Sequence, residues 1–454
     1  MYNNQVNTAL IKIVGLLGDF SKKEMSLYQK KLVASGFIAD DYPVKNEDDK
    51  VKRDEGIEKS LKDLFYPDFR DIMFMKSNND NNNRKLLSRR YKNEEKRALS
   101  LIKKNKDKST VEFPIIISNT EIFLFPGQIG LFSITIEIDK KENTLDDINN
   151  IIFLSRQFET DTNKGQKWHE WISKNLISGI ELRSNEKKIV KADEYSGSKF
   201  KVFSVIDCEE KENREALLYD MSTASVLTSG KGVGDYAPSK NYIKEILENK
   251  ISIFNNWDAL CLFDSFTCIG SNVITQEWQK STWAYTYFRI YLYRLFFKYN
   301  IYRYNSELHD EPVKLRNQFE QFLNDFNLSH ISFNFLPNEI YEKTGKALKL
   351  DEELGSFQAR INKLSSAILE EKQSKTNMLL QVVTALGAIS SVQPVFDGLS
   401  LVQKYLGWSN GVFYTLLVLI LLGIALGLLA FLMPELVKKI IKKIKGKNEN
   451  VNRI

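Results

Sequence analysis

The feature that most constrains this chain is an uncharged, apolar run near its C-terminal end. Residues 411–433 read "GVFYTLLVLILLGIALGLLAFLM" and contain no Asp, Glu, Lys or Arg. A helix needs about 20 such residues, at about 1.5 Å each, to cross the hydrocarbon core of a bilayer. The lysine-rich tail that follows at 434–454 is typical of a cytoplasmic flank. The sequence therefore predicts a transmembrane helix at 411–433 and a basic cytoplasmic tail at 434–454.

A second stretch, 378–402, is also long enough to span a bilayer, but it carries polar residues. Polar groups that face lipid are costly, so a spanning segment turns them toward partner helices or water. Steps of three and four residues place several of them on one helical face. We predict that this segment lines a pore through Gln381, Thr384, Ala388, Ser391 and Asp397.

The two stretches predict a membrane hairpin around a short outer loop at 403–410. Two crossings keep both termini in the cytoplasm, which agrees with the basic tail. The alternative is that 378–402 is an amphipathic surface helix or a soluble segment. In that case only 411–433 crosses the membrane.

The region before the hairpin, 271–377, is expected to be helical. Apolar residues at steps of three and four form a stripe typical of helices that associate with other helices: Leu354, Phe357, Ile361, Leu364 and Ile368. This stripe predicts an unbroken stalk helix from Asn338 into 378–402, bundled with identical stalks. A soluble antiparallel coiled coil is the alternative.

An aromatic segment, 282–304, "TWAYTYFRIYLYRLFFKYNIYRY", precedes the stalk. Its rings could form a platform on which nucleotide bases stack. The interpretation that we favour is a helix whose large side chains pack in a core. A further helix is predicted from Pro312 through Phe326.

Charge and cysteine content limit the class of protein. The net charge is +6, but six Lys and one Arg against two Glu give residues 435–454 alone a charge of +5. The remainder is close to neutral, so we expect no direct binding to nucleic acid. Three cysteines without a CxxC pair indicate a reducing compartment, and three scattered histidines make a zinc site improbable.

The first 110 residues are predicted to be a helical, basic region. The opening segment "MYNNQVNTALIKIVGLLGDF" reads as an amphipathic helix and not as a secretory signal, because Lys12 interrupts its apolar patch. An Asn-rich loop follows at 76–85. The basic stretch from Arg84 to Lys104 reads as a solvated helix face.

Residues 111–270 are predicted to form an α/β domain, a mixed sheet with helices against it. Strands are expected at "VEFPIII" and "TEIFLF", and after a Pro-Gly turn the alternation at 132–138 predicts a half-buried strand. Thr144 and Asp147 are spaced as a capping box for a helix at 144–155. Further elements are expected as strands at 200–206 and 216–219 and as a helix at 240–248.

The sequence contains no recognisable catalytic constellation, so we read this domain as a ligand sensor and not as an enzyme. The run "TSGKGVGD" at 228–235 lacks the GxxxxGK[ST] spacing of a phosphate loop. Candidate anion contacts are Arg156, which follows the 144–155 helix, and Lys231 in the glycine-rich run. Asp220 is a candidate acceptor for a ribose or an amine.

The order of these parts resembles the CorA-like magnesium transporter superfamily. The resemblance covers about 111–447 and is most specific from Phe333, "FNFLPNEIYEKTGKALKL". It implies an α/β cytoplasmic domain, a long stalk and a two-helix membrane hairpin, assembled as a homopentamer in which the first span lines the pore. Transporters of this family carry Gly-Met-Asn after the first span. Here Gly407 and Asn410 stand in that region without the complete motif.

A branch without that filter, the CorA-like membrane effectors associated with type III CRISPR systems, is more similar. This resemblance implies a multi-pass channel of the cell inner membrane. It would be gated by a nucleotide second messenger such as S-adenosylmethionine joined to AMP (SAM-AMP), and it would permeabilise the membrane in antiviral defence. The alternatives are a divalent cation transporter that carries Mg²⁺ and a membrane-anchored scaffold or binding protein.

Overall fold

The computed structural model describes residues 6–39, 59–74, 89–138 except 106, 143–182, 197–208, 214–227 except 226, 237–308, and 311–432 except 391 and 408. The Asn-rich loop at 76–85 and the basic tail lie outside the described residues. The chain divides into two compact units, Met1–Ile361 and Asn362–Ile454. Each unit is described by itself.

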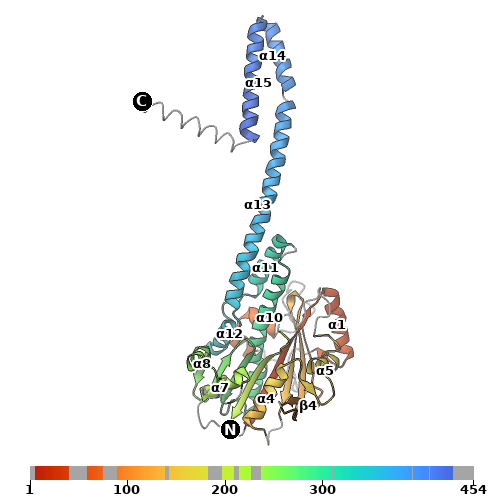
Figure 1. Ribbon diagram of the computed structural model, residues 1–454, viewed down its shortest axis with the longest axis vertical. Helices are drawn as coiled ribbons and strands as arrows, with labels where there is room; N and C mark the ends of the chain where they lie inside the picture. The colour runs from red at the N-terminus through yellow and green to blue at the C-terminus, as the bar shows by residue number, and fades with distance from the viewer. Residues whose placement is uncertain are drawn as a thin grey trace, which may run out of the picture. The chain divides into compact units, whose positions relative to one another are not determined.

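The first unit is built on a mixed sheet with flanking helices, so the predicted α/β class is confirmed (Figure 1). The strand order is β2-β3-β5-β6-β1-β8-β11-β10-β9, with β4 pairing to β5 and β7. Strands β8 and β11 are parallel, and the other described pairs are antiparallel. The strands are β1 Val6–Asp19, β2 Ile38–Ala39, β3 Arg89–Asn93, β4 Arg97–Lys104, β5 Thr110–Leu124, β6 Ile129–Glu137, β7 Asp161–Thr162, β8 Lys201–Cys208, β9 Lys250–Phe254, β10 Trp257–Cys261 and β11 Ser265–Gly270.

Helices pack against this sheet and against one another. In the first unit they are α1 Lys22–Ala34, α3 Pro67–Met73, α4 Leu145–Arg156, α5 Trp168–Asn175, α7 Arg214–Thr223, α8 Lys240–Leu247, α9 Glu277–Ser281, the π-helical turn η3 Thr282–Tyr287, α10 Phe288–Ser306, α11 Pro312–Phe326 and α12 Phe335–Ala347. Helix α13, Leu350–Ser390, begins in this unit and continues into the second. Helices α14, Val392–Leu406, and α15, Asn410–Leu432, complete the second unit.

The amphipathic helix predicted for the first 20 residues is wrong, because Val6–Asp19 forms the central strand β1. It pairs with β6 on one edge and β8 on the other, with Ile11 opposite Ile136 and Ile13 opposite Ile134. Ile11, Lys12 and Ile13 are all buried. A strand covered on both faces loses the alternation of polar and apolar residues that identifies a half-buried strand.

Two other local predictions in this unit are wrong. The basic stretch expected as a helix face supplies β3 and β4, which pair with opposite ends of the long strand β5. The strand expected at 216–219 lies inside helix α7, where the run Ala216–Tyr219 is buried. In both cases tertiary contacts override a weak local pattern.

Several predicted elements are confirmed. Strand β6 covers the alternating run, although its Ser133 and Thr135 are buried as well, so it is not half-buried. Helix α4 begins at the predicted capping box, in which the Asp147 amide donates to Thr144 Oγ1 at 3.2 Å. Strand β8, helix α8 and helix α11 lie where the sequence predicts them.

The aromatic segment forms the turn η3 and most of helix α10. Its large side chains pack in the core, which is the interpretation that the sequence favoured. Its rings contact the sheet on one side and α11 on the other. Phe296 stacks on Phe125 with centroids 4.4 Å apart, and Phe296 also meets Phe326 edge to face at 5.3 Å. This packing fixes α10 between the sheet and the later helices (Figure 1).

A buried ion network links the sheet to α10. Lys12 Nζ and Arg90 Nη2 each lie 2.5 Å from a carboxylate oxygen of Glu121. Lys12 Nζ also lies 4.4 Å from the ring centroid of Phe288 on α10. Burial alone would raise the pKa of Glu121, but the charges of Lys12 and Arg90 outweigh it and lower that pKa to about 2.

Replacing Glu121 with Gln should lower the free energy of unfolding by about 3–5 kcal/mol at pH 7, because it removes the carboxylate that two buried cations share. A depressed folded-state pKa gives stability that is complete above the ordinary value of 4.5 and is lost as pH falls toward about 2. The variant should therefore lack this loss of stability between pH 4.5 and 2, which urea unfolding at several pH values measures. The control Glu137→Gln, at a half-exposed pair with Lys96, should change stability by less than about 1 kcal/mol. Equal effects in both variants would contradict the role of the network.

The predicted unbroken stalk from Asn338 is also corrected. Helix α12 ends at Ala347, and Lys349 takes a left-handed conformation with φ of +54° before α13 begins. Two residues of the predicted stripe, Phe357 and Ile361, are buried in this unit. Phe357 meets Phe319 edge to face at 4.6 Å.

The second unit contains a helical hairpin. Helix α13 ends at Ser390, and the predicted single helix over 378–402 is in fact split between α13 and α14. Pro394 explains the break, because its ring clashes with the carbonyl of the residue four positions earlier, Ser390. Gly407, with φ of +61°, turns the chain from α14 into α15, and the rings of Phe396 and Phe413 join the two helices at 6.0 Å.

Within the residues that the structure describes, no helix combines the length and the apolarity needed to cross a membrane.

Candidate functional site

Arg156 is the predicted anion contact whose surroundings the structure describes best. It is the last residue of α4, and three side-chain or backbone donors hold this helix end in place. Thr160 Oγ1 donates to the Leu154 carbonyl at 2.6 Å, Trp168 Nε1 to the Ser155 carbonyl at 2.8 Å, and the Phe200 amide to the Arg156 carbonyl at 2.8 Å. The end of α4 at Arg156 is therefore held by the loop that follows it, by α5 and by the residue before β8.

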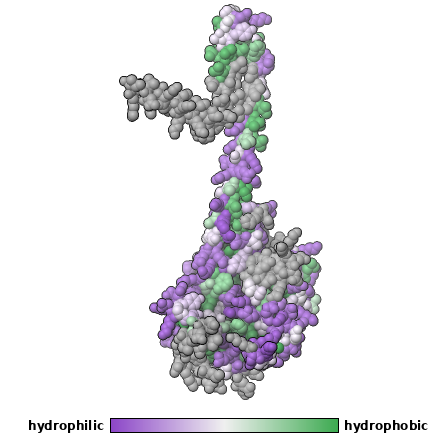
Figure 2. All heavy atoms as spheres, viewed as in Figure 1, coloured by the Kyte–Doolittle hydropathy of each residue, from purple (hydrophilic) through white to green (hydrophobic). Residues whose placement is uncertain are grey.

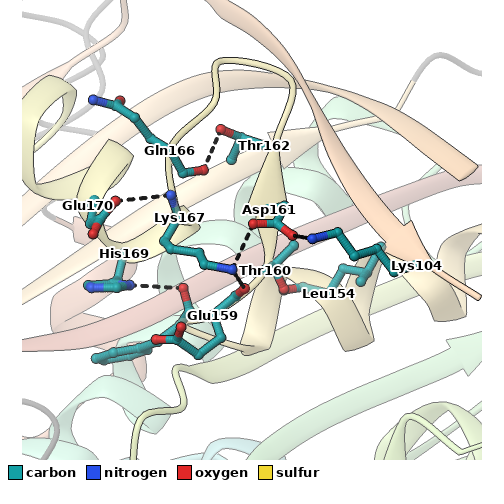
Figure 3. Close-up of polar contacts among 11 residues, drawn as sticks. Lys104, Leu154, Glu159, Thr160, Asp161, Thr162, Gln166, Lys167, His169 and Glu170 are labelled. Carbon is teal, nitrogen blue, oxygen red and sulfur yellow. Dashed lines mark hydrogen bonds and ion pairs between the residues drawn. The ribbon is translucent and has the colours of Figure 1, made fainter. Parts of the chain in front are cut away.

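Figure 3 shows how that loop is secured. Asp161 accepts from Lys104 at 2.6 Å and from Lys167 at 2.7 Å, which ties the loop to β4. His169 Nδ1 lies 2.9 Å from the carbonyl of Phe158, and its ring stacks on that phenyl ring. The charged groups of this loop contact one another or the backbone, so they hold the loop in place.

Lys201, at the start of β8, lies close to Arg156. Its Nζ donates to Asp264 Oδ1 at 2.5 Å and to the Phe263 carbonyl at 3.0 Å, and it stands 4.1 Å from the Phe263 ring centroid. Burial lowers the pKa of Lys201, while the Asp264 carboxylate opposes this change. Burial lowers the pKa of Arg156 in the same way, again opposed by Asp264.

Lys298 of α10 also lies near the ring of Phe263. Its Nζ lies 4.9 Å from that centroid and 4.8 Å from the centroid of Tyr302. It donates to the Leu348 carbonyl at 2.8 Å and forms an ion pair with Glu353 of α13. Burial lowers the pKa of Lys298, Glu353 opposes this, and the charge of Lys201 lowers it further.

We call the set Arg156, Lys201, Asp264, Lys298 and Glu353 the basic cluster. It holds three cations and two carboxylates. The side chains of Lys201 and Lys298 are 4% and 3% exposed, whereas those of Asp264 and Glu353 are about a third exposed. The Nε atom of Arg156 is buried and forms no hydrogen bond within the described part of the chain. Cations that have lost most of their water favour an incoming anion, so the cluster can bind a phosphate or similar group.

The basic cluster also reaches the start of the longest helix. Lys298 contacts the carbonyl at the end of α12 and the first turn of α13 at once. An anion that competes with Glu353 for Lys298 would release this attachment.

The other predicted ligand contacts do not join this cluster in the described structure. Asp220 is fully buried in α7, where Oδ1 accepts from Ser225 Oγ at 3.4 Å. Lys231 lies outside the described residues, as does the glycine-rich run around it.

The predicted pore-lining residues are only partly described. Thr384 is exposed on α13 and donates to the Leu380 carbonyl at 2.8 Å, and Gln381 is half-exposed on the same helix. Asp397 is exposed on α14 and accepts from Gln393 at 3.1 Å. Ser391 and the side chain of Ala388 lie outside the description.

Sequence reasoning missed four members of the basic cluster. A usable signal existed for Lys298, which interrupts the apolar run "LFFKYN", because a charge inside an otherwise aromatic helix needs a partner. Lys201 and Asp264 gave no such signal, since each follows from strand pairing between β8 and β11. In the residues that the structure describes, no group of three His, Cys, Asp or Glu side chains is arranged to hold a metal ion.

No protein-family model, curated protein or solved structure matches this chain.

The attachment of α13 can be tested by Glu353→Gln. We expect this change to lower the free energy of unfolding of the first unit by about 1–3 kcal/mol, because it leaves a buried ammonium group without its charged partner. Amide hydrogen exchange should also become faster at the start of α13. The neighbouring control, Glu352→Gln, removes only an exposed pair with Lys349 at 3.7 Å and should change neither quantity measurably. Identical behaviour of the two variants would show that the pair does not hold the helix.

Proposed function

We propose that this chain is a homo-oligomeric, pentameric CorA-like membrane effector of the cell inner membrane, gated by a nucleotide second messenger that binds its α/β domain. Opening of the channel would permeabilise the membrane as part of type III CRISPR antiviral defence. A messenger of the SAM-AMP type fits this proposal because it combines anionic and aromatic groups. The type of messenger and the defence role come from the resemblance of the sequence to such effectors.

The observation that carries the proposal is the exposed apolar surface of the second unit. Large hydrophobic side chains that would be buried in a globular domain are exposed there from residue 378 to residue 422, and Figure 2 shows green patches on this part of the chain. Examples are Met378 at 62%, Leu386 at 59% and Leu419 at 65% exposed. Burying one such side chain contributes about 1.5–3 kcal/mol. A surface of this kind marks contact with a membrane or with other helices.

The sequence supports the membrane as the environment of this surface. The uncharged run 411–433 has the length of a bilayer-spanning helix, and the basic tail supplies a cytoplasmic flank. The mixture of polar and apolar residues on 378–402 suits a helix with one face toward water and the other toward lipid or neighbouring copies. Copies of this segment around one axis would form the pore.

Gating requires a ligand that binds two states of the protein with different affinity. The basic cluster supplies a physical route, because its Lys298 is shared between α10 and α13. In the closed state Lys298 pairs with Glu353. In the open state the anionic group of the ligand, held by Arg156 and Lys201, takes the place of that carboxylate.

Dye release from liposomes tests this function. Purified protein in vesicles should release an entrapped dye when SAM-AMP is added, and the variant Arg156→Gln/Lys201→Met should need at least tenfold more ligand, since it removes two of the three cations. Lys96→Gln is the matched control, because Lys96 is 67% exposed and pairs only with Glu137 at the surface. Leakage that is indifferent to every nucleotide would contradict the proposal. Uptake of Mg²⁺ without such gating would support the cation transporter instead.

Membrane topology can be tested by cysteine labelling in intact cells. A membrane-impermeant maleimide should label Ser409→Cys from outside, because the outer loop of the hairpin contains this position. Ser356→Cys, exposed on the first turns of α13, should stay unlabelled until the cells are opened. The three native cysteines are buried and should give little background. Protection of Ser409→Cys in intact cells would rule out the hairpin and favour a scaffold with one span.

A further inference from the structure

A cavity in the α/β domain, separate from the basic cluster, has the properties of a small-molecule site. It has a volume of about 270 Å³ and lies between the β9–β10 hairpin, the loop after β11, helix α9 and the turn η3. Five of its eleven lining residues are aromatic, and we call it the tryptophan pocket: Phe254, Trp257, Trp278, Trp283 and Tyr287.

The inner wall of the tryptophan pocket is rigid. Trp257 and Trp283 are 7% and 4% exposed and meet edge to face with centroids 5.3 Å apart. Tyr287 packs edge to face on Trp283 at 4.8 Å. These rings contact one another and the sheet, so an incoming ligand would not have to order them.

The outer wall of the tryptophan pocket is exposed to solvent. Trp278 is 68% exposed and Phe254 is 44% exposed, although both line the cavity. Large exposed aromatic rings beside a cavity leave apolar area in contact with water, and a planar ligand stacked on them would cover it. The pocket therefore combines a fixed inner surface with an outer surface that lacks a covering group.

The loop that closes the pocket is held in one conformation. Asp207 Oδ2 accepts from the amides of Val273 and Ile274 at 2.6 and 3.1 Å. Gln279 Nε2 donates to the Asn272 carbonyl at 2.9 Å, and Asn256 Nδ2 donates to the Ser271 carbonyl at 3.0 Å. Asn272 itself is left-handed, with φ of +56°. The bond to Ser271 orients the amide side chain of Asn256, and Asn256 and Asn272 both line the cavity.

A π-helical turn supplies part of the wall. Residues Thr282–Tyr287 form η3, in which the Phe288 amide bonds back to the Trp283 carbonyl. Such turns are rare, are less favourable than an α-helix, and occur frequently at functional sites. Here the wider turn carries both Trp283 and Tyr287 to the pocket.

We propose that the tryptophan pocket binds the purine base of a nucleoside or nucleotide. The volume is near the lower end of the range for small-molecule sites, roughly 300–1,000 Å³, so it accepts one heteroaromatic ring system and not a whole dinucleotide. Aromatic stacking supplies the affinity, and the amides of Asn256 and Asn272 pair with the polar edge of the base. No lining residue is charged, so the phosphate group is not recognised here.

This inference rests on the proposed function for the choice of a purine over another planar heterocycle. The pocket is separate from the basic cluster. Trp283 and Lys298 are fifteen residues apart along η3 and α10, which is roughly 22 Å at about 1.5 Å per residue. Base recognition and anion recognition are therefore two distinct contacts with the α/β domain.

Calorimetric titration of the full chain in detergent micelles tests the proposal. Adenosine should bind, and saturating ribose 5-phosphate, which carries no base, should leave the affinity for adenosine unchanged. Trp278→Ala should weaken adenosine binding about tenfold or more, because it removes a stacking surface. The residue is mostly exposed, so the fold should persist, and circular dichroism checks this. Phe153→Ala, a 39% exposed aromatic on α4 away from the cavity, should bind adenosine like the parent.

Equal adenosine affinity in Trp278→Ala and Phe153→Ala would overturn the proposal, as would competition between ribose 5-phosphate and adenosine. The outcome separates this inference from the proposed function. Adenosine binding that depends on Trp278, without dye release by any nucleotide, would keep the pocket and reject the channel. Nucleotide-dependent dye release that is unchanged in Trp278→Ala would keep the channel and reject the pocket.

Discussion

The burial of most of helix α10 is the constraint on which the rest of the first unit depends. Residues on every side of this helix are buried, including its charged Arg289 and Lys298. Burying a charged group without a partner is costly, so the charged side chains of such a helix need partners within the protein. Arg289 does so at the Met73 carbonyl, 2.8 Å away, and Lys298 does so at the Leu348 carbonyl and Glu353. The helices before and after α10 are therefore fixed by its polar side chains as well as by its rings.

The two candidate binding regions follow from that position. The turn η3 leads directly into α10 and carries Trp283, whereas Lys298 stands about four turns further along. Helix α12 contacts α10 beside both regions, since Leu336 lines the tryptophan pocket and the Arg294 Nε donates to the Tyr341 carbonyl at 3.0 Å between them. The pair α10–α12 thus connects the tryptophan pocket with the basic cluster.

Local patterns in the sequence identify elements that have one polar and one apolar face, and elements whose ends carry capping residues or proline. The capping box at Thr144 and the proline at residue 312 predict helix starts correctly, because these residues act on their own helix. Strand β1 is missed because its neighbours on both edges bury both faces. Only one of the five residues of the basic cluster is predicted, for a similar reason. Arg156 stands at a recognisable helix end, but Lys201 and Asp264 meet only after β8 and β11 pair in register.

The left-handed Lys349 has a mechanical consequence. A non-glycine residue in that conformation costs about 1–2 kcal/mol and interrupts the ladder of backbone bonds between α12 and α13. Axial force cannot pass along a continuous helical rod at this point. The start of α13 is held instead from its flank, by the ammonium group of Lys298 and the rings around Phe357. Side chains of neighbouring helices, and not a continuous backbone ladder, therefore set where this helix begins.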